Sequence, residues 1–275
     1  MAKRSKRKKP TMAERADRYE LYLKAVQEPE AEVPFFDRVY QREYGRRPSV
    51  LREDFCGTFA VCCEWVRRSS DRVAVGVDID PEPLGWGREH HLSKLKAKQQ
   101  RRVELLQDDV RNVNGPKADV LAAQNFSFWY FKTRDELRRY FSAAYQNLAD
   151  RGIMVLDMMG GSETIEEDHT DETQFRGFVY HWEQARFDPI THDCSYYIHF
   201  SFSDGSKLKR AFEYHWRFWT VPEVCEVLLE AGFSRADVYW EDADAKTGEG
   251  TGVYRRRKRA ASDPAWICYI VGVKG

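Results

Sequence analysis

Two short segments, separated by about one helix length, constrain the fold of this chain more than any other feature. Residues 50–59 begin as an apolar strand and end in an acidic pair and a Cys-Gly-Thr turn. Residues 73–78 are a β-branched run that ends in Asp78, about twenty residues after the turn. A strand, a turn, a helix and a second strand at this spacing hold a nucleoside at the carboxyl ends of the strands. We therefore expect a nucleoside-binding α/β sheet.

Strands and helices alternate along the chain up to about residue 158, which predicts a parallel sheet. Three aromatic and β-branched runs follow, separated by turns at Asp188-Pro189 and Asp204-Gly205. The expected fold class is α/β, a doubly wound Rossmann-like sheet with a three-stranded antiparallel β-insert after strand five. The expected helices are 12–27, 35–44, 58–68, one opening at Pro81 with Asp80 as its cap, 135–148 and 221–230. The expected strands are 49–53, 72–78, 103–107, 119–124, 153–158, 178–187, 195–202, 207–218, 236–240 and 266–273.

Charge is unevenly distributed, although 44 basic and 44 acidic residues give a net charge of zero. Residues 1–9 contain six basic residues and no acidic one, so the rest of the chain is mildly acidic. We expect residues 1–11 to form a disordered basic tail and residues 12–275 to form one domain, in which residues 174–219 are the insert. The tail is a candidate contact for RNA or an anionic surface, whereas the acidic body does not favour nucleic acid.

Six cysteines are present, but no C-x-x-C pair and no H-x₃-H pair. This pattern favours reduced core cysteines in a cytoplasmic protein, with neither a disulfide framework nor a metal site. No apolar run approaches the ~20 residues of a membrane span, and the start lacks the apolar segment of a secretory signal. We therefore expect no membrane partner.

The run Leu-Arg-Glu-Asp-Phe-Cys-Gly-Thr at residues 51–58 carries a resemblance to a known family. With Asp78 it resembles the first two motifs of class I S-adenosylmethionine-dependent methyltransferases, and an uncharacterised bacterial and plant group with this turn in particular. The resemblance extends from about Tyr19 to the last strand. Phe55 and Phe59 depart from the pattern, because they stand where the family has glycine.

The resemblance implies S-adenosyl-L-methionine as the cofactor. Gly57 allows the backbone to approach it, and Asp78 is placed to accept both ribose hydroxyls. Asp109 would meet the adenine amino group, although the adjacent Asp108 could instead cap or face water. Arg52 either pairs with an internal acid or holds the methionine carboxylate. The predicted cofactor-binding residues are Arg52, Glu53, Cys56, Gly57, Thr58, Asp78, Ile79, Asp109, Val110 and Asn125.

The methyl acceptor is less well indicated. Aromatic residues after strand four offer faces that attract a sulfonium cation, although they also suit a core. Helical spacing makes Tyr22 a core residue, with closure of the pocket as the alternative. Strand 207–218 alternates between an aromatic and a polar face, and similar inserts cap the acceptor pocket of small-molecule amine methyltransferases. The candidate acceptor residues are Tyr22, Trp129, Tyr130, His215 and Arg217.

Three functions are consistent with these patterns. The favoured one is N- or O-methylation of a small-molecule acceptor, for which the sequence names no catalytic base. An RNA or nucleic-acid methyltransferase or binding protein is the alternative, supported by the basic tail and the basic run at 255–259. An NAD-dependent oxidoreductase also has an acid after strand two, but the chain lacks its G-x-G-x-x-G turn.

Overall fold

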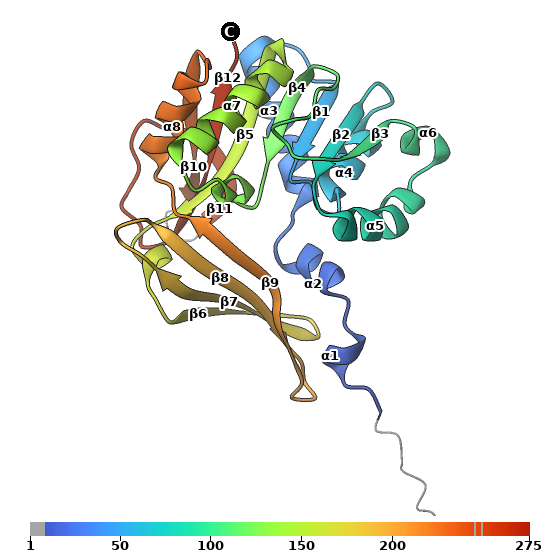
Figure 1. The fold of residues 1–275 in the computed structure, drawn as a ribbon, viewed down its shortest axis with the longest axis vertical. Coiled ribbons are helices and arrows are strands. Elements are labelled where there is room, and N and C mark those ends of the chain that lie inside the picture. The colour runs from blue at the N-terminus through green and yellow to red at the C-terminus, as the bar shows by residue number, and fades with distance from the viewer. Residues whose placement is uncertain (1–8, 245, 249) are drawn as a thin grey trace, which may run out of the picture. The chain divides into compact units, whose positions relative to one another are not determined.

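The computed structural model describes residues 9–244, 246–248 and 250–275 (Figure 1). The chain divides into two compact units. The insert unit contains the described residues up to Gln27 together with Ile165–His215, and the sheet unit contains Glu28–Thr164 and Trp216–Gly275. The first helical segment therefore belongs with the insert. Most of the expected basic tail, residues 1–8, lies outside the described residues.

The sheet unit is built on an eight-stranded sheet with the order β11-β10-β12-β5-β4-β1-β2-β3. Strands β1 to β5 run parallel, and β12 joins antiparallel to β5. The order reverses at β1, which lies between β2 and β4, and ligands of such sheets bind at that reversal. The predicted doubly wound sheet is confirmed. Its strands are β1 (Val50–Asp54), β2 (Val73–Asp78), β3 (Val103–Gln107), β4 (Ala118–Ala123), β5 (Leu148–Gly160), β10 (Arg235–Ala243), β11 (Gly250–Arg256) and β12 (Trp266–Val273).

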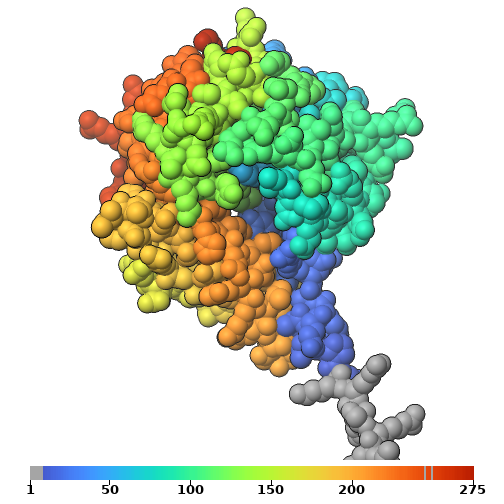
Figure 2. Space-filling view, in the orientation of Figure 1, coloured from blue at the N-terminus to red at the C-terminus, as the bar shows by residue number. Residues whose placement is uncertain are grey.

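Helices cover both faces of this sheet. Side chains of α3, α4 and α5 pack with alternate strand residues such as Leu51, Val120 and Val155 in one buried cluster. Helices α7 and α8 cover the other face, and Figure 2 shows them as its outer surface in light green and orange. The main helices are α3 (Pro29–Tyr44), α4 (Ala60–Arg68), α5 (Pro81–His90), α7 (Arg134–Asn147) and α8 (Val221–Glu230), with short turns α6 (Ala97–Gln100), η1 (Leu92–Lys94), η2 (Ser127–Tyr130) and η3 (Glu163–Ile165).

Local capping explains where the helices begin. The expected cap of α5 is confirmed, because Asp80 accepts a hydrogen bond from the Glu82 amide at 2.9 Å. The single helix expected over residues 12–27 was wrong: Asp17 caps a second helix, so α1 (Met12–Arg15) and α2 (Arg18–Ala25) are separate. Pro29 was expected to lie between the helices 12–27 and 35–44. It begins α3, where its missing N–H costs nothing, so α3 starts six residues before the expected position.

The insert unit contains a four-stranded sheet with the order β6-β7-β8-β9. The expected count of three was wrong, because β6 (His169–Phe175) pairs antiparallel with β7 (Phe178–Phe187). β6 is a mostly exposed edge strand of polar residues, so it lacks the alternation that marks a half-buried strand. β8 (Asp193–Ser201) and β9 (Lys207–Arg217) complete the sheet, and Tyr19 and Tyr22 of α2 pack against Phe212.

β11 was also missed, because no strand was expected between residues 240 and 266, where a basic run stands at 255–259. It pairs antiparallel with β10 at the sheet edge, and most of its residues are exposed. Edge strands with charged residues carry little apolar signal, because half of their hydrogen-bonding groups face water.

Asp119 joins β4 to the start of β1 and to the end of α3. Its buried carboxylate accepts hydrogen bonds from the Ser49 and Val50 amides at 2.8 and 3.0 Å. The Tyr40 hydroxyl and the Arg46 guanidinium each donate to it at 2.8 Å. Although burial opposes ionisation, the hydrogen bonds that it accepts lower the pKa of Asp119.

We expect Asp119→Ala to lower the free energy of unfolding by about 3 kcal/mol, because buried donors would lose their shared acceptor. Urea unfolding at pH 7 measures this, with the exposed Asp150→Ala as a control that changes stability by about 0.5 kcal/mol or less. Since the pKa of Asp119 is lowered, its contribution is present above the ordinary Asp pKa and is lost as the pH falls. The difference between wild type and variant should therefore shrink in acid; an equal difference at all pH values would contradict this assignment.

Candidate functional site

The turn after β1 is held in a strained conformation. Phe55, Gly57 and Phe59 all have positive φ angles, of 55°, 52° and 48°. The two phenylalanines stand where the resembled family has glycine, and they adopt the left-handed conformation that glycine adopts without cost. For other residues this conformation costs roughly 1–2 kcal/mol each. Strain of this size persists only where the surroundings enforce it, and it concentrates at functional sites.

Packing enforces these angles. Phe59 is fully buried in the core, and a side chain at Gly87 would meet the Phe59 ring at 2.5 Å and the Thr58 carbonyl at 2.4 Å. Phe55 packs edge-on against Phe131 and Tyr140, with ring centroids 5.9 and 5.6 Å apart. Cys56 is buried and donates its amide to the Val77 carbonyl at 3.0 Å. The turn is therefore fixed from both sides.

Asp78 connects the end of β2 to this turn. One carboxylate oxygen accepts the Gly57 amide at 2.7 Å, and the other accepts the Asp80 amide at 2.9 Å. Burial raises the pKa of Asp78. The next residue, Ile79, is an apolar side chain that is 69% exposed, which suits contact with a flat apolar ring.

Arg52 makes the internal pair that was one of its two predicted alternatives. The side chain is 2% exposed, and its Nε lies 2.6 Å from Asp54 Oδ1. Its terminal nitrogens donate to the carbonyls of Val110 and Val113 at 2.7 and 3.2 Å. Tyr140 donates to the other oxygen of Asp54 at 3.1 Å. Arg52 thus positions the loop after β3, while its role as a cofactor ligand stays a prediction.

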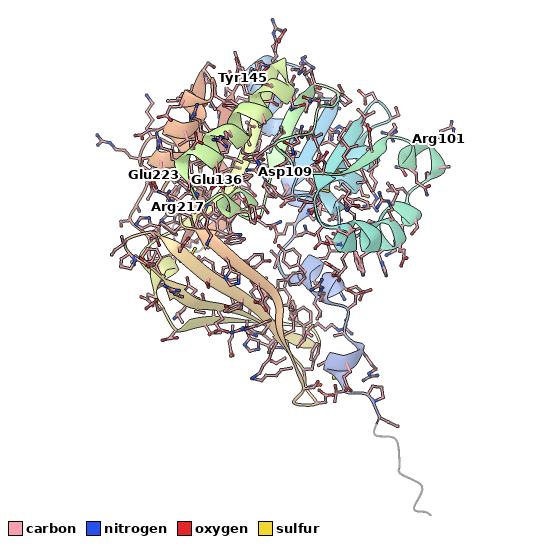
Figure 3. All side chains as sticks on the ribbon, viewed as in Figure 1. Arg101, Asp109, Glu136, Tyr145, Arg217 and Glu223 are labelled. Atoms are coloured by element: carbon pink, nitrogen blue, oxygen red, sulfur yellow. The ribbon has the colours of Figure 1, made fainter. Side chains whose placement is uncertain are left out.

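Asp109 lies in that loop and is labelled in Figure 3. Its two carboxylate oxygens accept hydrogen bonds from Nε and Nη2 of Arg111 at 3.0 and 2.6 Å, and this pair lowers the pKa of Asp109. The Arg111 guanidinium also lies over the Phe131 ring, 5.0 Å from its centre. Asp108 is exposed and accepts the Asp109 amide at 2.7 Å, so it faces water, which was one of its predicted alternatives.

Asp157, three residues before the end of β5, was missed by the sequence analysis. Its carboxylate accepts the amides of Asn125 and Phe126 at 2.8 and 3.0 Å. Both of these residues have positive φ, 58° and 57°, so Asp157 holds the exit of β4 in a left-handed turn. Burial raises the pKa of Asp157 to about 7. The available signal was a single acid inside the apolar run Ile153–Met159.

The acceptor candidates in the sheet unit lie in different environments. Trp129 is fully buried against Trp216 and Phe218, whereas the neighbouring Tyr130 is 65% exposed. Arg217 donates to the Lys132 carbonyl at 3.1 Å and to Glu223 at 3.3 Å, and it lies over the Trp219 ring. Arg217 and Glu223 are labelled in Figure 3. These contacts give Arg217 a structural role, and substrate contact by Trp129, Tyr130 or Arg217 stays a prediction.

The other two acceptor candidates belong to the insert unit. Tyr22 packs in its core against Phe212 at 4.6 Å, which is the core role that helical spacing favoured. The His215 side chain is 58% exposed, and its Nδ1 lies 3.1 Å from Ser195 Oγ. His215 is therefore accessible for binding, and its predicted role is open to experiment.

The basic run near the C-terminus is largely paired with acids. Arg255 and Arg257 both contact Asp242, at 2.5 and 2.8 Å, and Arg256 lies 2.8 Å from Asp237. Among the described residues, no cluster of three or more His, Cys, Asp or Glu could hold a metal ion. No helix in the described part of the chain is long and apolar enough to cross a membrane.

No family model and no curated protein sequence matches the chain. Solved structures, in contrast, match the chain. An S-adenosylmethionine-dependent methyltransferase from Clostridium acetobutylicum aligns with a TM-score of 0.65 and 18% identity, over 94% of this chain and 98% of that chain. CalS10, an amino pentose methyltransferase from Micromonospora echinaspora, aligns at 0.66 and 16%, over 94% and 98%. KedS8, a sugar N-methyltransferase from Streptoalloteichus, aligns at 0.62 and 19%, over 93% and 92%.

The chain has the fold of S-adenosylmethionine-dependent methyltransferases. The TM-scores exceed 0.6 over nearly the whole length of each chain, so the likeness includes the insert as well as the sheet. At identities below 20% the likeness is one of fold. Activity and ligands therefore have to be argued from the residues at the carboxyl edge of the sheet.

Glu53 makes the stability of this site dependent on pH. It is buried at the end of β1, where Oε2 accepts the Cys62 amide at 3.0 Å. Burial raises the pKa of Glu53 to about 7, although the hydrogen bond from Cys62 opposes this. The folded protein therefore holds a proton that the unfolded chain has lost between the ordinary Glu pKa of about 4.3 and about 7.

We expect Glu53→Gln to gain stability relative to wild type as the pH rises from 5 to 7, by about 3 kcal/mol at most, and to keep a constant advantage above pH 7. Gln keeps the oxygen that accepts the Cys62 amide. Urea midpoints at pH 5, 6, 7 and 8 test this, with the exposed Glu89→Gln as the matched control. A difference that does not change with pH would show that Glu53 ionises normally in the fold.

Proposed function

We propose that this protein is an S-adenosylmethionine-dependent methyltransferase that methylates a small-molecule acceptor at nitrogen or oxygen. The observation that carries the proposal is the bond between Asp78 and the Gly57 amide, at the point where the strand order reverses in a methyltransferase fold. It joins a strained, close-approach turn to a carboxylate that is suited to a ribose.

The residues present fit this cofactor. A Cβ built on Gly57 meets no atom within 4 Å, so the turn leaves open space beside its backbone. Asp78 would accept the ribose hydroxyls, with Ile79 against the adenine ring and Asp109 and Val110 at its polar edge. The carboxyls of Glu53, Asp78 and Asp157 all have raised pKa values because of burial, so a cationic ligand would be stabilised among them.

The cofactor, when bound, supplies an activated methyl group on a sulfonium. The chain itself positions the acceptor and the methyl group, and it excludes water from the site. Asp157 holds Asn125 beside the expected point of transfer, and Arg52 holds the loop that carries Asp109 and Val110. These residues act by fixing the geometry in which the acceptor meets the methyl carbon.

A small acceptor is favoured over a nucleic acid. CalS10 and KedS8 are described as methyltransferases of an amino pentose and of a sugar nitrogen. Three of the five basic residues in the run that supported the nucleic-acid alternative are paired with Asp237 and Asp242. We propose that the insert unit selects the acceptor, with the exposed His215 as its candidate contact.

Calorimetry with S-adenosylhomocysteine and NAD tests the cofactor. We expect S-adenosylhomocysteine to bind and NAD not to bind. Asp78→Ala should weaken binding of S-adenosylhomocysteine by about 1.5–3 kcal/mol, the range for hydrogen bonds to a charged group. Asp80→Ala is the matched control, because it removes a helix cap two residues away and should lower stability without changing affinity. Binding of NAD without binding of S-adenosylhomocysteine would contradict the proposal.

Gly57→Ala separates backbone strain from ligand contact. Because its φ is 52° and its Cβ would enter open space, we expect a loss of stability of roughly 1 kcal/mol but a loss of S-adenosylhomocysteine affinity of at least about tenfold. Gly205→Ala is the control, since Gly205 also has positive φ and open space but lies in the β8–β9 turn. Equal affinities in both variants would place the cofactor away from this turn.

A further inference from the structure

Glu32 is a buried carboxylate for which the fold itself offers no reason. It lies in the first turn of α3 and is 8% exposed, and its Oε2 has no hydrogen-bond partner among the described residues. The charged groups that act on it are acids, Glu53, Asp157 and Glu28. Burial and these acids raise the pKa of Glu32 well above its ordinary value. An unpaired buried carboxylate costs stability, so its presence points to a ligand.

A second buried acceptor atom lies on the same face of the sheet. Gln124, 5% exposed, donates Nε2 to the Val155 carbonyl at 3.1 Å, but its Oε1 has no partner in the described part of the chain. Gln124 follows Ala122 by two residues, and Ala122 packs in the buried cluster on the α3 side of the sheet. Because side chains alternate between the two faces of a strand, Gln124 lies on that same face. Glu53 and Asp157 continue the same alternation on β1 and β5. The two orphaned oxygens are both acceptors, so the missing group is a donor.

Aromatic rings lie beside the carboxylates of Glu32 and Asp157. Tyr269 is the cross-strand partner of Asp157, and its ring stacks on Phe35 of α3 with centroids 4.3 Å apart. Tyr254 meets Tyr269 edge-on at 4.7 Å. Phe35 is one helical turn after Glu32, so carboxylate and rings share one side of α3. Carboxylates, an amide oxygen and aromatic faces together suit a cation that donates hydrogen bonds.

We infer that Glu32 and Gln124 bind the amino group of the methyl acceptor as an ammonium, so that the acceptor is an amine. This inference rests on the proposed function. Glu32 takes one proton from the ammonium, and the freed nitrogen lone pair bonds to the methyl carbon. The bond from carbon to sulfur breaks, and its electron pair stays on sulfur as a neutral thioether. The product leaves as a methylated ammonium, and Glu32 then returns its proton to water.

Sinefungin tests this without knowledge of the acceptor. It carries an amine in place of the methyl group, and it shares the amino-acid end of S-adenosylhomocysteine. We expect the wild type to bind sinefungin more tightly than S-adenosylhomocysteine. Glu32→Gln should weaken sinefungin by about 10- to 100-fold, as for a lost hydrogen bond to a charged group, and change S-adenosylhomocysteine by less than about twofold.

Controls make each outcome decisive. Glu30→Gln, exposed on the same helix, should leave both affinities unchanged. The melting temperature of Glu32→Gln should equal or exceed that of wild type, because an unpaired carboxylate is removed; a clear fall would show a structural role and overturn the inference. Equal losses for both ligands would assign Glu32 to the cofactor's own amino group and also overturn it.

The two proposals fail differently. If the wild type binds neither ligand, the proposed function fails, whatever Glu32 does. If the wild type binds both and Glu32→Gln leaves their ratio unchanged, only the amine inference fails. Gln124→Leu provides an independent variant, and it should reduce the preference for sinefungin in the same direction as Glu32→Gln.

Discussion

The buried guanidinium of Arg52 is the interaction on which the candidate site depends. It pairs with Asp54 inside β1 and holds the Val110 and Val113 carbonyls of the loop after β3. Through Asp54 and Tyr140 the same network reaches α7 on the other face. Breaking a buried pair of this kind costs about 3–5 kcal/mol, because a charge is left uncompensated. One side chain therefore fixes three elements around the carboxyl edge of the sheet.

Two carboxylates, one on either side of the strand reversal, hold strained turns in the same way. Asp78, at the end of β2, accepts the Gly57 amide in the left-handed turn after the neighbouring β1. Asp157, near the end of β5, accepts the Asn125 and Phe126 amides in the left-handed turn after the neighbouring β4. In each case an outer strand stabilises the strained exit of an inner one. Both exits border the place where this fold binds its ligand.

The same edge carries more buried negative charge than the fold neutralises. Burial raises the pKa values of Glu53 and Asp157 to about 7, and burial together with these two acids raises the pKa of Glu32 well above its ordinary value. Buried acids with raised pKa values cost stability at neutral pH. A cationic ligand would offset that cost on binding, which agrees with the sulfonium cofactor that we propose and with the ammonium that we infer.

The sequence by itself determined the parallel sheet, the Asp80 cap, and the positions of Gly57 and Asp78, because periodicity, capping and strand ends are local signals. Only the tertiary structure decided that Arg52 pairs internally, that Asp157 holds Asn125, and that Glu32 Oε2 is buried without a hydrogen-bond partner among the described residues. It also revealed β6 and β11, whose polar edge residues carry no alternation. These features depend on which residues of distant strands and helices become neighbours, and strand pairing sets that, whereas local sequence does not.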